Sequence, residues 1–313
     1  MNTFGKTIGL TIFGESHGLS IGAVLDGLPS GEAIDWDAVR TEMARRAPGK
    51  NKMSTARSEK DAFEVQSGFF NGHTTGTPLC AIIRNSDQHS RDYDQLRHIM
   101  RPGHADYSGK IRYGGFNEYR GGGHFSGRLT APLVFAGAVA SQILARHGIT
   151  VGSHILRLAG IADKPFDAAG ETASTLQALK KETLPVLDKA QAGPMEEKIL
   201  EAKNDLDSVG GVIECMVTGL PAGIGDPFFD SVESQLSHMM FSVPAVKGIE
   251  FGDGFALADL RGSQANDAFY YDGDAVKTRT NHNGGINGGI TNGMPVVFRL
   301  AVKPTASISQ KQE

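Results

Sequence analysis

The chain has 313 residues, of which 40% are hydrophobic and 21% charged, values typical of a folded protein with a substantial core. Its formal net charge of −4 gives no electrostatic reason to expect nucleic acid or an anionic membrane as a partner. Two cysteines without CxxC spacing, and no signal pattern at the N-terminus, favour a cytoplasmic protein with two buried thiols.

Short apolar segments separated by turn residues dominate the first third of the chain. Residues 14–18 are a predicted turn between two strands. Asp35 is the predicted N-cap of a helix that ends near Arg46. Four strands are predicted in this part, at residues 7–13, 20–25, 63–66 and 79–83.

The middle of the chain favours helices. Residues 131–146 predict an apolar helix closed by His147 and Gly148; it contains Gln142 and falls short of a membrane span. Residues 163–207 are rich in Lys, Glu and Ala and predict surface helices inserted between two halves of the chain. Further strands are predicted at residues 149–158, 211–218 and 295–302.

Two sequence patterns occur twice in the same order. GLPSG at residues 27–31 returns as GLPAG at 219–223, and GHTTGTP at 72–78 is echoed by GITNGMP at 289–295. Both members of the second pair precede a predicted strand. The order predicts an internal duplication with a pseudo-two-fold core, and chance similarity of Gly/Pro turns is the alternative.

The most informative segment is RGGGHFSGRLTAP, which begins at Arg120. Its three consecutive glycines expose backbone N–H groups and allow close approach of a ligand. Arg120 and Arg128 offer donor forks suited to phosphate or carboxylate. Ser126 and Thr130 lead into a helix N-terminus, where anions are stabilised. The segment therefore predicts a cradle for a multiply anionic small molecule.

Two other turns carry a histidine that can move protons near neutral pH. In GESHG, Ser16 precedes His17, and because adjacent side chains rarely point at each other, a Ser–His nucleophile is not expected. In RPGHAD, Asp106 could orient the imidazole of His104. Taken singly, each motif is equally compatible with a structural turn.

A run of cations follows the first predicted helix and favours either a phosphate clamp or a solvated basic face; it comprises Arg45, Arg46, Lys50, Lys52 and Arg57. Residues 281–293 are dense in glycine and side-chain amides and suit a planar ligand such as an isoalloxazine or a nucleotide, without a dinucleotide-binding fingerprint. Residues 303–307 add a cation and two hydroxyls. A flexible polar loop is the alternative for both segments.

Other site types lack support in the sequence. No HExxH motif or clustered Cys/His spacing predicts a metal site, and no Walker loop is present. The isolated histidines are expected to be mostly structural or solvent-facing: His73, His89, His98, His147, His154 and His238.

Taken together, these segments resemble the chorismate synthase family from Phe13 to Ser307, in the motifs GESHG, RRxPG, RPGHAD, YRGGGxxSxR, GLPAG, AVKGxExGDGF, LRGSQ, NHxGGIxGGI and KPT. The resemblance implies an α+β fold, a β-α-β sandwich with antiparallel sheets, forming one domain over residues 1–313 and assembled as a homotetramer. It also implies a lyase of the shikimate pathway, in aromatic amino acid biosynthesis. Such an enzyme converts 5-enolpyruvylshikimate 3-phosphate to chorismate and phosphate by anti-1,4-elimination with reduced FMN.

The same resemblance implies roles for individual residues. His17 would serve the leaving phosphate, His104 would protonate reduced flavin, and Ser16 would relay a proton near flavin N5. Positions that match substrate contacts are Arg45, Arg46 and Arg128, and Arg46 with Lys52 matches a nicotinamide-nucleotide site, with NADPH as the reductant. Positions that match FMN contacts are His124, Phe125, Ser126, Pro244, Ala245, Gly288, Lys303, Pro304, Thr305, Ala306 and Ser307.

Three features depart from the family pattern. His124 and Lys52 stand where many members have arginine, so two bidentate contacts would be weaker or made differently. The 313 residues also stop before the family's Arg-His-Asp-Pro-Cys segment, which supplies an aspartate that acts with Ser16 and an arginine at the site. We expect this segment to follow Glu313 in the complete protein.

Two other functions fit the same residues. A flavin-dependent oxidoreductase with net electron transfer would need a dedicated hydride-donor site and would consume reduced nicotinamide in step with substrate. A non-catalytic flavin- or phosphate-binding protein would not need His17 and His104.

Overall fold

The computed structural model describes residues 2–49, 51–54, 57, 59–86 and 99–312, and the chain divides into two compact units. The first unit comprises Met1–Ile143 with Lys311–Glu313, and the second Leu144–Gln310. Each contains one five-stranded antiparallel sheet together with helices, so the predicted α+β class with antiparallel sheets is confirmed.

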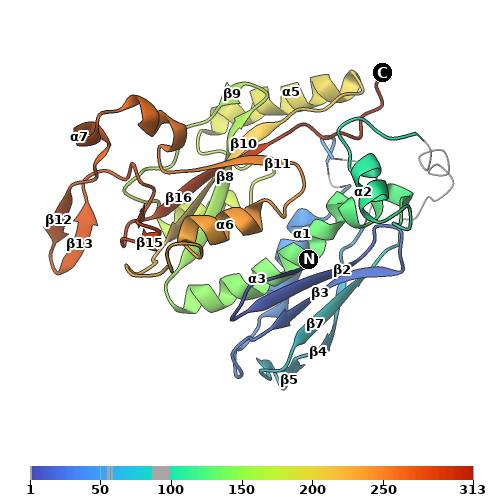
Figure 1. Ribbon diagram of the computed structural model, residues 1–313, viewed down its shortest axis with the longest axis horizontal. Helices are drawn as coiled ribbons and strands as arrows, with labels where there is room; N and C mark the ends of the chain where they lie inside the picture. Colours follow the sequence, from blue (N-terminus) through green and yellow to red (C-terminus); the bar gives the residue numbers. More distant parts are fainter. Residues whose placement is uncertain (1, 50, 55–56, 58, 87–98, 313) are drawn as a thin grey trace. The chain divides into compact units, whose positions relative to one another are not determined.

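The sheet of the first unit has the strand order β1-β2-β3-β7-β4 (Figure 1). Its strands are β1 (Thr3–Phe4), β2 (Gly9–Gly14), β3 (Ser20–Asp26), β7 (Leu79–Arg84) and β4 (Phe63–Ser67). A short hairpin of β5 (Phe69–Phe70) and β6 (His73–Thr74) precedes β7. The four strands predicted here are therefore present, with ends that differ by at most two residues.

The helical segments among the described residues that accompany this sheet are α1 (Trp36–Arg46), α2 (Asp106–Arg112), η3 (Arg120–Phe125), η4 (Gly127–Leu129) and α3 (Thr130–Arg146), the last of which runs into the second unit. Asp35 caps α1 as predicted, because its carboxylate accepts hydrogen bonds from two backbone N–H groups of the first turn. An aromatic cluster packs α1 and α3 together. Trp36 stacks on Phe135 with ring centroids 6.1 Å apart, and Phe63 of β4 meets the same Phe135 ring.

The segment Gly127–Arg146 is long and apolar enough, by length and composition, to cross a membrane. Its length and composition therefore do not support the prediction that this segment is too short to span a membrane. Its packing indicates a core helix instead, because Ala131, Phe135 and Val139 of α3 are fully buried within the protein.

The second unit has a sheet of strand order β11-β16-β10-β8-β9. Its strands are β8 (Thr150–Leu158), β9 (Ile161–Ala162), β10 (Gly211–Thr218), β11 (Val246–Phe251) and β16 (Val296–Val302). Two hairpins are added, β12 (Phe269–Asp272) with β13 (Ala275–Thr278), and β14 (Ile286–Asn287) with β15 (Ile290–Thr291). Its helical segments are α4 (Ala173–Leu179), η5 (Lys189–Gln191), α5 (Ala192–Asn204), α6 (Val232–Met240), η6 (Gly254–Asp259) and α7 (Gly262–Ala265).

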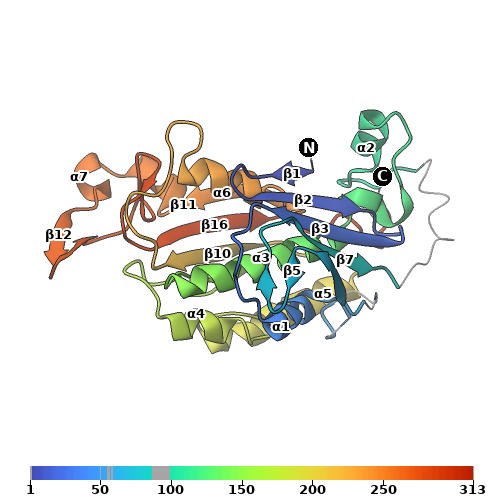
Figure 2. The same ribbon diagram turned by 90° about the horizontal axis from the view of Figure 1, so that it is seen from below.

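Helices lie on both faces of this second sheet, with α6 above and α4 below it in Figure 2. Side chains alternate along β16, so Val297 packs with Leu176 of α4, whereas Val296 and Phe298 belong to the cluster that includes Leu236 of α6. The region predicted as surface helices between two halves is thus placed differently. It lies inside the second unit, between β8 and β10, and it buries one apolar face against the sheet.

The two units repeat one topology, as the duplicated sequence patterns predict. In chain order the first unit runs β2, β3, α1, β4, a short hairpin and β7, while the second runs β8, β10, α6, β11, a short hairpin and β16. The corresponding sheet orders, β2-β3-β7-β4 and β8-β10-β16-β11, are the same. Helices α4 and α5 and the hairpin β12–β13 are additions to the second copy.

The repeat extends to individual hydrogen bonds. Thr74 Oγ1 donates to the carbonyl of Pro29 at 2.6 Å and accepts from the N–H of Glu32 at 3.0 Å. Thr291 Oγ1 donates to the carbonyl of Pro221 at 2.7 Å and accepts from the N–H of Ile224 at 2.9 Å. Chance similarity of turns does not produce the same bonds at matching positions, so the internal duplication is confirmed.

The prediction that both thiols are buried needs correction, whereas His154 fits the prediction of a structural histidine. Cys80 and Cys215 are half-buried rather than buried, although desolvation raises the pKa of Cys215 to about 12. His154 is fully buried on β8, within hydrogen-bond distance of the carboxylates of Asp163 and Glu214. Its partners are 9 and 60 residues away in the sequence, so only the fold brings them together.

Candidate active site

The triple-glycine segment is a turn that only glycine accommodates without strain. Gly121, Gly122 and Gly123 have φ values of 58°, 83° and 54°, all in the left-handed region. A Cβ added to Gly121 would overlap the ring of His17, and one added to Gly122 would lie 3.1 Å from Cε1 of His104. Two histidines from distant motifs therefore lie against successive glycines.

The turn that carries His17 is docked onto this glycine segment. Ser16 is fully buried; its N–H donates to the carbonyl of Gly123 at 3.1 Å, and its Oγ lies 3.2 Å from the carbonyl of Gly121. Oγ also lies 2.8 Å from Nδ1 of His17. The expectation that these adjacent side chains point apart is wrong here, because the glycines leave room for both on one side.

This geometry indicates how the protons are arranged. If the hydroxyl of Ser16 donates to the carbonyl of Gly121, it must accept from Nδ1–H of His17, and we assign that tautomer. Glu118 lies close to this imidazole. Hydrogen bonds from Arg120 and, less strongly, the charge of His17 hold the pKa of Glu118 below its ordinary value.

The RPGHAD motif closes on itself around Asp106. Arg101 donates to both carboxylate oxygens, from Nε at 2.8 Å and Nη2 at 2.7 Å, and Nδ1 of His104 lies 2.6 Å from Oδ1. Burial raises the pKa of Asp106, but hydrogen bonds from Arg101 and the charge of His104 outweigh this effect and hold the pKa below its ordinary value. The predicted orientation of His104 by Asp106 is confirmed.

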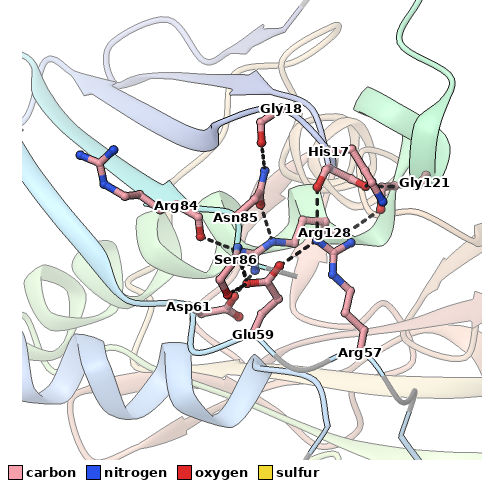
Figure 3. A network of polar contacts seen from close by, with 12 residues as sticks. His17, Gly18, Arg57, Glu59, Asp61, Arg84, Asn85, Ser86, Gly121 and Arg128 are labelled. Atoms are coloured by element: carbon pink, nitrogen blue, oxygen red, sulfur yellow. Dashed lines mark hydrogen bonds and ion pairs between the residues drawn. The ribbon is translucent and has the colours of Figure 1, made fainter. Parts of the chain in front are cut away.

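A buried group of charges lies beside the His17 turn (Figure 3). Asp61 accepts hydrogen bonds from Nη1 of Arg46 at 2.5 Å and from Nη1 of Arg128. Burial lowers the pKa of Arg46, and its ion pair with Asp61 offsets part of that effect. Of the predicted anion ligands, the structure therefore brings Arg46 and Arg128 together.

The other predicted cations do not share one location. Arg45 faces outward on α1, half-exposed, and donates to Glu42 at 2.8 Å. Lys52 is exposed in the loop 51–54, and Lys50 lies outside the described residues. Arg57 extends to the His17 turn, where its Nη2 donates to the carbonyl of Ser16 at 3.2 Å.

Sequence reasoning missed the two acids of this group. Glu59 is buried; burial raises its pKa, but hydrogen bonds from Arg57 and Ser86 and the charge of Arg128 outweigh that and lower it to about 2. Glu59 and Asp61 follow the basic run at alternate positions, and this spacing is the only signal the sequence offers. It does not reveal which arginines they meet.

The predicted FMN contacts of the first unit have distinct environments. His124 contacts the residue that precedes the His17 turn: its Nδ1 lies 2.8 Å from the carbonyl of Gly14. Ser126 caps η4 by accepting from the N–H of Arg128. Phe125 lines a cavity of about 380 Å³, together with Met100, Asp106, Lys110, Gly114, Gly115, Phe116, Asn117, Glu118, Tyr119 and Gly122.

The remaining predicted FMN contacts belong to the second unit. Ala245 has a positive φ of 72°, and its carbonyl accepts from the N–H of Lys303 at 2.9 Å, which brings two of these segments together. Gly288 forms the turn of the β14–β15 hairpin. Pro244 adjoins Ala245, and Pro304, Thr305, Ala306 and Ser307 continue from Lys303 after β16.

Within the described part of the chain, no group of three or more His, Cys, Asp or Glu side chains could hold a metal ion. Two of the isolated histidines, His89 and His98, lie outside the described residues. His73 has its Nδ1 2.9 Å from the carbonyl of Asn71, as expected for a structural histidine.

Comparison with known proteins gives a consistent result. The family model for chorismate synthase matches residues 8–313. The chain is 46% identical to the chorismate synthase of Chitinophaga pinensis, covering 100% of this chain and 83% of that protein. It is 44% identical to that of Dehalococcoides mccartyi and 43% identical to that of Methanococcoides burtonii, in each case over 99% of this chain and 84% of the relative.

The fold agrees with these sequence relationships. A crystal structure of chorismate synthase matches the chain with a TM-score of 0.80 and 30% sequence identity, covering 96% of this chain and 85% of the other.

Proposed function

We propose, because the chain belongs to the chorismate synthase family, that this chorismate-forming lyase acts on 5-enolpyruvylshikimate 3-phosphate with reduced FMN. The single observation that carries the proposal is the placement of His17 and His104 against Gly121 and Gly122. The reaction is an anti-1,4-elimination: a C–O bond to phosphate and a C–H bond break, and chorismate and phosphate are released. It therefore needs a proton donor and cations near a polyanionic leaving group.

His17 is the proposed proton donor to the leaving phosphate. The hydroxyl of Ser16 engages Nδ1, which leaves Nε2 as the atom that holds the transferable proton. Glu118 supports the imidazolium form because a nearby carboxylate stabilises a positive charge. A positioned general acid contributes about 10²- to 10⁴-fold to a rate, which is the share we assign to His17.

Arg46 and Arg128 are proposed to supply positive charge for the substrate anions, with Arg45 as a more exposed contributor. Guanidinium groups suit phosphate and carboxylate because their donors form a planar fork. Partial burial strengthens the attraction, since low local polarity screens charges less than water does.

The residues present fit a flavin. The cavity beside Gly122 has aromatic walls at Phe125 and Tyr119 together with hydrogen-bonding groups at Asn117 and Lys110, which suit a flat, polar ring. We propose that FMN is held by His124, Phe125, Ser126, Pro244, Ala245, Gly288, Lys303, Pro304, Thr305, Ala306 and Ser307. When bound and reduced, it supplies electron density to the elimination without net consumption. His104 holds a proton at Nε2, with Asp106 fixing its ring.

Further properties follow from family membership and are proposed with it. NADPH would reduce the flavin at a site that includes Arg46 and Lys52. The protein would work in the cytoplasm as a single domain and a homotetramer. Side chains such as Phe228 and Phe229, each 91% exposed, suit burial between subunits.

The test is phosphate release from 5-enolpyruvylshikimate 3-phosphate with photoreduced FMN under anaerobic conditions, using the full-length protein. We expect many turnovers per flavin without net oxidation. Release in step with flavin oxidation would indicate the oxidoreductase, and no release would indicate a binding protein.

A variant tests the histidine assignment in the same assay. His104→Ala should fold and bind FMN but lose turnover by about 10²-fold or more, because its proton-transfer group is gone. FMN binding by fluorescence quenching provides the folding control. A turnover near that of the wild type would remove the role proposed for His104.

A further inference from the structure

Five side chains form a charge cluster beside the His17 turn: Arg46, Arg57, Arg128, Glu59 and Asp61. The acids are nearly inaccessible, with side-chain exposures of 0% for Asp61 and 1% for Glu59. Among the described side chains of the cluster, three guanidinium groups and two carboxylates leave one positive charge in excess. The cluster is therefore both buried and cationic. Burying an excess charge costs free energy, and this cost points to a functional role for the cluster.

Asp61 lies at the centre of the charge cluster. It receives Nη1 of Arg46 on one oxygen and Nη1 of Arg128 on the other, so a single carboxylate determines where both groups lie. Its backbone φ is +50°, a left-handed conformation that is uncommon for residues with a side chain but is adopted by aspartate more often than by most. This conformation occurs at the residue that joins the two arginines.

Arg128 is committed to contacts inside the protein. Its side chain is 2% exposed, its Nη1 donates to Asp61 and its Nε donates to Asn85 Oδ1 at 3.0 Å. Arg46 and Arg57 are more accessible, with side-chain exposures of 17% and 22%. Arg46 and Arg57 can therefore turn donors toward an anion more readily than Arg128, which also anchors the cluster.

The charge cluster is also tied to the turn that carries His17 (Figure 3). Asn85, held by Arg128, donates from Nδ2 to the carbonyls of Glu15 at 3.0 Å and Gly18 at 2.8 Å. Both ends of the turn around Ser16 and His17 are thus bonded to one amide. Displacing Arg128 would move the proton donor as well as the cations.

We propose that Asp61 is a positioning residue, whose carboxylate fixes Arg46 against an anionic substrate and, through Arg128 and Asn85, fixes the turn that carries His17. The inference rests on the proposed function only in requiring an anionic substrate. It assigns Arg128 an anchoring role in addition to any contact with the substrate.

A purely electrostatic role makes the opposite prediction. Neutralising a carboxylate next to an anion site removes repulsion, so charge alone would make Asp61→Asn bind the substrate more tightly. Loss of positioning weakens binding, because the arginines and the turn move. A merely structural role would lower the amount of folded protein and leave the KM of the folded fraction unchanged.

The experiment compares Asp61→Asn with Glu64→Gln in the full-length protein. Glu64 is a matched control: it lies three residues away, also accepts from an arginine, and is exposed. We expect Asp61→Asn to raise the KM for 5-enolpyruvylshikimate 3-phosphate and the inhibition constant of inorganic phosphate by about 10-fold or more, and to lower kcat as His17 shifts. Glu64→Gln should match the wild type in all three.

The outcomes separate the two proposals. An unchanged or lower KM in Asp61→Asn would overturn the positioning role while leaving the lyase intact. If the wild-type protein shows no turnover, the proposed function fails, and inorganic phosphate binding by titration calorimetry still tests Asp61. If Asp61→Asn does not fold, Asp61→Glu retains the charge and moves it by one methylene; it should also raise KM, and wild-type behaviour would contradict the proposal.

Discussion

The missing side chain at Gly121 determines where the His17 ring can lie. The backbone of this glycine is left-handed, with φ at 58°, and the imidazole occupies the space that a Cβ would take. Successive glycines thus do two things at once: they permit the turn, and they let two rings approach it closely. The position of a proposed proton donor depends on a residue with no chemistry of its own.

Gly121→Ala should therefore impair the reaction without replacing any titratable group. The new methyl group displaces the His17 ring and strains the backbone, and we expect turnover to fall by about 10²-fold, the effect of a displacement of roughly 1 Å. Gly137→Ala is the control, because nothing lies within 4 Å of its Cβ and α3 is helical there. It should keep full activity and gain about 0.5–1 kcal/mol in stability. Normal turnover in Gly121→Ala would contradict the argument.

For individual residues, the sequence predicts which side chains are suited to chemistry better than it predicts which partners they contact. His17, His104 and the glycines are recognisable because their residue types and turns are unusual. Glu59 and Asp61 are not, because an acid near a basic run is ordinary and its meaning depends on which arginine the fold brings to it. The contact between Ser16 and His17 was missed for a related reason, since it requires the space left by a glycine about a hundred residues later.

The helices and strands that repeat in the two units are accompanied by repeated hydrogen bonds in the loops between them. Thr74 and Thr291 are both buried, and each holds a GLP turn against the following hairpin with one donated and one accepted hydrogen bond. The side chain is the same in both copies, although the strands around it differ in sequence. The shared requirement is a hydroxyl that can donate and accept at once.

Thr74→Val and Thr291→Val should destabilise the protein by similar amounts. Valine has the same shape but leaves a backbone N–H and a backbone carbonyl, both partly buried, without that partner, and losing such a hydrogen bond costs about 0.5–1.5 kcal/mol. The measurement is the free energy of unfolding in urea for each variant. Thr77→Val, at an exposed position, should change it by less than about 0.5 kcal/mol. Unequal losses in the two copies would show that the loops are not equivalent in energy.

The predictions of helices and strands are correct where a whole apolar segment is buried. Strands such as β3 and β7 were predictable because their apolar residues are bounded by turn residues. The polar composition of residues 163–207 correctly predicted helices but concealed their buried faces, because only a few side chains such as Leu176 and Met195 contact the core. Composition averages over a helix, whereas packing depends on one side of it.

Across the whole molecule, buried carboxylates with lowered pKa values occur in both units. Glu59 and Asp106 hold arginines in the first, and Asp163, Glu214 and Asp267 accept several hydrogen bonds in the second. Each folded pKa lies below the unfolded value. The stability these groups contribute is therefore present above the unfolded pKa and is lost as the pH falls through the folded pKa.

Glu214 is the carboxylate at which this dependence of stability on pH can be tested separately. Both ring nitrogens of His154 face carboxylates, Nδ1 at 3.0 Å from Asp163 and Nε2 at 2.9 Å from Glu214, so the imidazole lies between two acids. Glu214 also accepts from Arg299 at 2.9 Å. Burial alone would raise the pKa of Glu214, but these bonds outweigh it and hold the pKa below its ordinary value. Protonating Glu214 in the folded protein therefore costs more free energy than protonating it in the unfolded chain.

Glu214→Gln should destabilise the protein at pH 7 and flatten its response to acid. Breaking a buried ion pair costs about 3–5 kcal/mol, and the substitution leaves Arg299 with only the more distant carboxylate of Glu250 and the buried His154 with one carboxylate instead of two. As the pH falls below the unfolded pKa of about 4.3, the wild type loses the contribution of Glu214 and the variant has none to lose, so their melting temperatures should converge. Thermal melts from pH 7 to pH 3 measure this, with the exposed Glu201→Gln as the control that should follow the wild type. Melting curves of Glu214→Gln and the wild type that stay parallel across this range would show that Glu214 does not contribute through its charge.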